Sequence, residues 1–222
     1  MDTALSTMLL ADARVPTGGH AQSGGLEPAL QAGMSPDDVP TFLESRLRTV
    51  GLVEAGAVVL AARAARRRPV QLSPVHEALL ARTPARPLRE SSGMVGRGLR
   101  RLAERIRGDD PAVATLPELG PRPQRPVVLG ALAAALGLED AQAARSGLYE
   151  DAQTVAAAAL KLLAVDPLDA TTWVVDAGDT IEELVTAATD TGSCAELPAL
   201  TAPHIEQWTL LHATRTRRIF VA

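Results

Sequence analysis

The chain has 222 residues, and 46% of them are hydrophobic, which is enough to bury a substantial core. The 22 basic and 26 acidic residues give a formal net charge of −4 and aromatic residues make up only 2%, which argues against nucleic acid as a main partner. A lone cysteine excludes an internal disulfide, no apolar run is long enough to span a membrane and no secretory leader is visible, so we expect a cytoplasmic protein.

A glycine-rich turn, residues 16–27 (PTGGHAQSGGLE), is the first distinctive feature of the chain. It lies between two apolar segments that predict helices. Glycine adopts positive φ angles easily and lets other backbone segments approach closely. A plain connection between helices is the ordinary interpretation of such glycines, but two Gly-Gly pairs so close together favour a functional turn.

The remainder of the chain predicts helices. Apolar residues recur at steps of three and four from 39 to 64, after a cap and early proline at Ser35 and Pro36, and predict one long helix. Residues 171–176 (TTWVVD) have strand-like composition but no pairing partner. We therefore predict an all-α fold, a single compact multi-helix bundle domain over 1–222. Similar periodic segments are 89–107, 148–162, 181–188 and 205–211.

Two segments fall outside the predicted helices. Residues 108–126 carry five prolines, and we interpret them as a Pro-rich surface loop within the domain rather than a linker between two domains. The last helix is expected to end near Thr214, which leaves a tail of residues 215–222 with three arginines around Ile219 and Phe220.

Motifs of catalysis and cofactor binding are missing from the sequence. The only lysine, Lys161, is not in a phosphate-binding loop, and His76-Glu77 lacks the second histidine of a zinc protease. We therefore predict a protein that is not an enzyme and holds no cofactor. Two alternatives stay open: a helical regulatory or binding protein, and a small helical enzyme that uses Glu27 and His20.

Arginines gather in two places. Those that close the long helix complement its negative end and are expected to be solvated, whereas those within 89–107 are expected to be solvated or to meet an acidic protein. The first group is Arg63, Arg66, Arg67 and Arg68, and the second is Arg97, Arg100, Arg101, Arg105 and Arg107.

The turn resembles the N-terminal signature of the UreF family of urease accessory proteins, an aspartate followed by Pro-Thr-Gly-Gly and then Ser-x-Gly-Leu-Glu. The matching residues are Asp12, Pro16, Thr17, Gly18, Gly19, Ser23, Gly25, Leu26 and Glu27. Residues 89–97, 127–137 and 218–222 resemble three further segments of that family.

The resemblance implies an all-helical homodimer that joins UreG, a nickel-carrying GTPase, to UreD (also called UreH), and through it to the urease apoprotein. Such a protein helps to deliver nickel and carbon dioxide to the urease metal centre, without hydrolysing urea or GTP and without a resident metal. It also implies partner-binding residues. On the GTPase side they are Pro16, Thr17, Gly18, Gly19, His20, Ser23, Gly25, Glu27 and Lys161, and on the UreD side Arg217, Arg218, Ile219 and Phe220.

Three details qualify these sites. His20 is a weak candidate for transient nickel contact, because a histidine in a loop is usually structural. The tail is expected to become ordered only when a partner binds, with Phe220 as its anchor. Residues 161–167 (KLLAVDP) replace the family's Arg-Leu-x-Pro-Leu-Gly-Gln, and a lysine lacks the planar fork of arginine.

Overall fold

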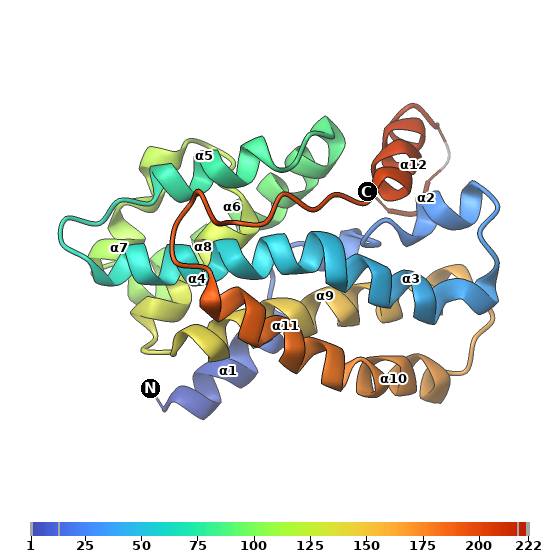
Figure 1. Cartoon of the computed structure of the whole chain (residues 1–222), viewed down its shortest axis with the longest axis horizontal. Coiled ribbons are helices and arrows are strands. Elements are labelled where there is room, and N and C mark those ends of the chain that lie inside the picture. Colours follow the sequence, from blue (N-terminus) through green and yellow to red (C-terminus); the bar gives the residue numbers. More distant parts are fainter. Residues whose placement is uncertain (1, 13, 217, 221–222) are drawn as a thin grey trace.

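A computed structural model describes residues 2–12, 14–216 and 218–220, and within these ranges the chain is helical and contains no strand (Figure 1). The predicted all-α fold is confirmed. The α-helices are α1 (Thr3–Ala11), α2 (Leu26–Gln31), α3 (Val39–Arg46), α4 (Leu52–Arg66), α5 (Ser73–Ala81), α6 (Arg86–Arg107), α7 (Pro111–Ala114), α8 (Arg125–Ala135), α9 (Asp140–Leu162), α10 (Pro167–Asp176), α11 (Gly178–Asp190) and α12 (Pro203–Ala213). The 3-10 turns are η1 (Gly19–Ala21), η2 (Pro36–Asp38) and η4 (Leu116–Leu119), and η3 (Leu47–Gly51) is π-helical. No helix in the described ranges is long and apolar enough to cross a membrane.

Helix α4 lies at the centre of the bundle, between two clusters of buried side chains. One cluster joins it to α8, where Gly130 lets the backbones meet: a Cβ there would lie 2.3 Å from the carbonyl oxygen of Val58. The other cluster joins α4 to α9, with Val59 and Leu148 among its buried members. Small residues along α4 allow this close packing on both sides.

The long helix expected over 39–64 is present, but it contains a π-helical turn. Helices α3 and α4 follow one another through η3 without a break in direction. Within this turn, the hydroxyl of Thr49 donates to the carbonyl oxygen of Ser45 at 2.7 Å. The apolar period continues through η3, whose Leu47 and Gly51 are buried, which is why the sequence pattern predicts a single regular helix.

The Pro-rich segment 108–126 is more ordered than the predicted surface loop. It contains α7 and η4, and Val113 and Leu116 are buried in the core. Pro111 occupies the first turn of α7, where proline is well tolerated, and the side chain of Asp110 accepts the N–H of Ala112 at 2.8 Å. These prolines therefore begin helical turns instead of preventing them.

The arginines at the end of α4 are only partly solvated, contrary to the prediction. Arg63 Nε donates to Asp140 at 2.6 Å, and its other nitrogens donate to the carbonyl oxygens of Thr189 and Thr191. Arg66 binds the same carboxylate and the carbonyl oxygen of Leu138. The two side chains therefore tie the end of α4 to the start of α9 and the end of α11.

Replacing Asp140 with asparagine should lower the free energy of unfolding by about 1 kcal/mol at pH 7. Burial raises the pKa of Asp140, but hydrogen bonds from Arg66 and Arg63 outweigh it and hold the pKa below its ordinary value. A lowered folded-state pKa stabilises the protein above the unfolded-state pKa, and this stability is lost as the pH falls through the folded-state pKa. Urea unfolding at pH 7 and at about pH 3 should therefore show the difference between variant and wild type shrinking on acidification.

The matched control is Asp169→Asn, at an exposed carboxylate in α10. It should change stability little at either pH. A loss for Asp140→Asn that is equally large at both pH values would assign it to packing rather than to the ion pairs.

Candidate functional site

The glycine-rich turn has the backbone conformation that its glycines predict. Gly18 has φ +89° and Gly25 has φ +88°, in the left-handed region that favours glycine. At Gly25 a Cβ would also meet the Cγ2 of Ile205 at 2.9 Å, so this glycine lets the start of α2 pack on α12. Pro16 and His20 are exposed, on the outer side of the turn.

The turn packs directly on α6 at Gly98, a contact that was not predicted from the sequence. A Cβ on Gly98 would lie 2.2 Å from the carbonyl oxygen of Thr17 and 2.9 Å from its Cα. Backbone atoms cannot yield as a flexible side-chain end can, so only glycine fits here. The available signal was the cluster Gly93-x-x-Gly96-x-Gly98 inside a helix, because such glycines mark close backbone contact.

The second half of the turn begins α2 with two buried polar residues. Ser23 is fully buried and its Oγ accepts the backbone N–H of Glu27 at 3.3 Å. Glu27 has only 3% of its surface exposed. A carboxylate in such a position requires hydrogen-bond donors to replace water.

The C-terminal tail supplies those donors. The backbone N–H groups of Ile219 and Phe220 donate to Glu27 Oε1 and Oε2 at 2.7 and 2.8 Å, and Gln31 Nε2 donates to Oε1 at 3.1 Å. Buried His212, on α12, places its Nε2 3.2 Å from Glu27 Oε2, within ion-pair distance although the two atoms make no hydrogen bond. Glu27 therefore joins the glycine-rich turn to the tail and to the last helix.

Lys161 joins the same two segments from the end of α9. Its Nζ donates to the carbonyl oxygen of His20 at 3.1 Å and lies 5.1 Å from the centre of the Phe220 ring. An ammonium group over an aromatic face is a favourable cation–π arrangement. Lysine at this position thus contacts both predicted partner-binding segments.

The tail differs from the expectation that it becomes ordered only on partner binding. Phe220 is 4% exposed and packs in the core cluster beside α2, whereas Ile219 is 66% exposed. The reason is that buried Glu27 offers acceptors to two tail amides. Arg218 also has an interaction within the chain, and Arg217 lies outside the described residues.

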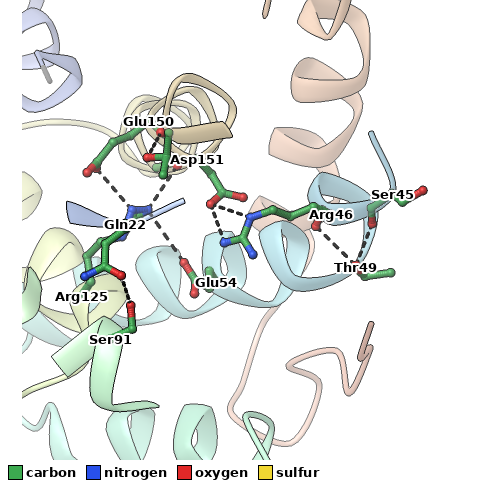
Figure 2. Close-up of polar contacts among 11 residues, drawn as sticks. Gln22, Ser45, Arg46, Thr49, Glu54, Ser91, Arg125, Glu150 and Asp151 are labelled. Carbon is green, nitrogen blue, oxygen red and sulfur yellow. Dashed lines mark hydrogen bonds and ion pairs between the residues drawn. The ribbon is translucent and has the colours of Figure 1, made fainter. Parts of the chain in front are cut away.

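A group of buried and half-buried charged side chains lies beneath the turn (Figure 2). Arg46 donates from Nε and Nη2 to Asp151 Oδ1 at 3.1 and 2.7 Å, and both side chains are buried. Arg125 lies between Glu150, at 3.3 Å, and Glu54, at 3.8 Å. Gln22 in the turn is hydrogen-bonded to Ser91 on α6 beside this group. These charged residues come from distant parts of the chain, so local sequence patterns did not predict that they meet.

Burial and neighbouring charges shift pKa values within this group. Burial raises the pKa of Glu54, with a further rise from Asp151, while Arg125 opposes both. Burial also lowers the pKa of Arg46, but the Asp151 carboxylate reverses this and leaves it above the ordinary value. Two adjacent cavities of about 100 Å³ each lie here. Gly19, Gln22, Arg125 and Glu150 line both, and Arg46, Glu54 and Asp151 line one of them. The turn therefore borders two hollows that are lined in part by these charged side chains.

The histidines are dispersed. His76 Nε2 accepts the N–H of Gln124 at 3.2 Å, and burial lowers its pKa. His204 stacks on Trp208 with the ring centres 5.5 Å apart. Within the described ranges, no group of three or more His, Cys, Asp or Glu side chains is arranged to hold a metal ion.

Together, the fold and this junction define an all-helical protein whose N-terminal turn and C-terminal tail meet at one place on the surface. A model of the UreF family matches residues 34–178. Urease accessory protein UreF of Mycobacterium tuberculosis H37Rv is 36% identical over 99% of this chain and all of the relative. The UreF proteins of Mycobacterium sp. JLS and Mycobacterium marinum are 35% and 33% identical, over 99% and 100% of this chain and all of each relative.

The chain belongs to the UreF family, whose curated members here are named as accessory proteins of urease rather than as urease. The resemblance stated from the sequence is thereby confirmed. The turn and the tail lie outside the part that the family model matches, but the relatives align with them over nearly the full chain.

Proposed function

We propose that this protein is a non-catalytic assembly factor for the urease nickel centre, which binds the GTPase UreG and the accessory protein UreD at the same time. One observation carries the proposal: the turn and the tail, predicted to meet different partners, are held together by Glu27 and Lys161. A protein that binds the turn or the tail therefore binds a segment that Glu27 and Lys161 connect to the other one.

The two sides of this junction present different chemistry. The GTPase side offers exposed Pro16 and His20 with the backbone of Gly18 between them. The UreD side offers exposed Ile219, held in place by its buried neighbour Phe220. Ser23, Gly25 and Glu27 lie inside, so their part in partner binding is to shape the turn rather than to touch the partner.

The enzyme alternative is not supported by the geometry of its two residues. Glu27 is buried and its two oxygens accept hydrogen bonds from the tail, while His20 is exposed on the outside of the turn. An acid–base pair needs both groups within reach of one substrate. We further propose that the chain works as one domain, as a homodimer, in the cytoplasm and with urease apoprotein as the final partner.

Co-purification with UreD and UreG tests the proposal. Ile219→Asp, which places a charge in the tail where an apolar contact is expected, should abolish capture of UreD and leave the fold intact. Leu168→Asp is the matched control, because Leu168 is also exposed, at 74%, but lies on α10. Equal capture of UreD by both variants would refute the tail assignment, and failure of the wild-type protein to capture either partner would refute the proposed function.

A further inference from the structure

An unusual run of positive charge lies on α6, beside the glycine-rich turn. Arg97, Arg101 and Arg105 are spaced four residues apart, so they form a stripe along one side of the helix, and all three are exposed. The opposite side carries buried Val95 and Leu99. We call these three arginines the α6 stripe.

Within the described part of the chain, none of the three side chains of the stripe makes a hydrogen bond or an ion pair. Two other arginines of the same helix are paired: Arg86 binds Glu90 at 2.7 Å and Arg100 binds Glu104 at 3.3 Å. Like charges four residues apart on a helix repel one another and lower its stability. Ion pairs therefore offset the charge of Arg86 and Arg100 on α6, whereas the three arginines of the stripe remain in an unfavourable arrangement.

The position of the stripe links it to the turn. Gly98, which follows Arg97 directly, is the residue on which the backbone of Thr17 rests. The first arginine of the stripe is thus adjacent to the contact between α6 and the turn. A protein that docks on the turn is placed beside the stripe.

From this arrangement we infer that the α6 stripe binds an acidic surface on the protein that docks at the glycine-rich turn. The inference rests on the proposed function and adds the chemistry of the partner's surface. The charge is local, because the whole chain has a net charge of −4. An exposed positive stripe on an acidic protein steers an acidic partner to that side and accelerates association.

The test compares two triple variants with equal loss of charge. Arg97→Gln, Arg101→Gln and Arg105→Gln together remove the stripe. Arg67→Gln, Arg68→Gln and Arg122→Gln remove the same charge from exposed arginines outside α6 that form no ion pair with a described residue. Glutamine is a good helix former and the substitution relieves repulsion, so the stripe variant should remain folded, which circular dichroism checks. The probe is purified UreG. Its association rate is measured at about 50 mM NaCl, where charges are weakly screened, and at about 300 mM NaCl, where they are strongly screened.

At low salt, the stripe variant should associate about tenfold more slowly than the wild type. The control variant should associate less than about twofold more slowly than the wild type. At high salt, the difference in association rate between the wild type and the stripe variant should shrink. Equal rates for the two triple variants would overturn the inference and leave the proposed function in place. Absence of UreG binding by the wild type would overturn both. Binding of labelled duplex DNA by the wild type but not by the stripe variant would assign the stripe to nucleic acid and overturn the acidic-protein inference.

Discussion

Phe220→Ala should lower the free energy of unfolding by about 3 kcal/mol, the usual cost of removing a buried aromatic ring. The ring is 4% exposed, packs in the core cluster beside α2 and lies under the ammonium group of Lys161. Its loss also weakens the two amide contacts that satisfy Glu27. A tail that becomes ordered only on partner binding, as expected from the sequence, would contribute almost nothing to stability, whereas the buried Phe220 ring predicts a large contribution. Urea unfolding, with hydrogen exchange at the amides of residues 219 and 220, measures the effect.

The matched control for Phe220 is its neighbour Ile219, whose side chain is 66% exposed while its amide binds Glu27 in the same way. Ile219→Ala should therefore change stability by less than about 0.5 kcal/mol. If the two substitutions cost the same, Phe220 is not docked in solution and the tail is free, as the sequence suggested.

Gly98→Ala should reduce UreG capture at least tenfold while it leaves the protein folded. Alanine is a better helix former than glycine by about 1 kcal/mol, so α6 itself should not weaken. The added Cβ would nevertheless lie 2.2 Å from the carbonyl oxygen of Thr17, and the turn has to move away. Affinity measured by calorimetry, together with thermal unfolding, separates loss of binding from loss of fold.

Gly178→Ala supplies the control for this exchange. Gly178 begins α11, and a Cβ added there meets no atom within 4 Å. It should leave UreG affinity unchanged. Normal affinity in the Gly98 variant would show that UreG binding does not depend on the position of the turn, and the functional assignment of residues 16–20 would then be wrong.

Local patterns were sufficient to predict the all-α fold and the long helices. Apolar periodicity and a cap such as Ser35 act over a few residues, so they can be recognised directly in the sequence. The strand-like segment 171–176 lies in helix α10 because Asp166 caps it, Pro167 starts it and no neighbouring strand exists among the described residues. Tertiary context decided the outcome where composition was ambiguous.

The site was only half predictable, for reasons of distance along the chain. The turn was identified because its glycines are adjacent in sequence. The Arg46–Asp151 pair joins residues 105 positions apart, and nothing local in either segment indicates the other. The docking of the tail was not predicted for the same reason, since the side chain that accepts its amide hydrogen bonds, Glu27, is near the other end of the sequence. Gly98 was visible as a helical glycine, but its partner at Thr17 was not.

The contact between Glu27 and the tail also bears on the order in which the protein can be completed during synthesis. Glu27 and Phe220 are 193 positions apart, so the carboxylate leaves the ribosome long before the amides that it needs. Until then, α2 carries a charged group that cannot be buried without cost, and the neighbouring turn lacks its final support. A nascent chain, or one clipped before residue 219, therefore presents an unfinished turn. Partner proteins that select the finished turn would join only molecules whose translation has reached the tail.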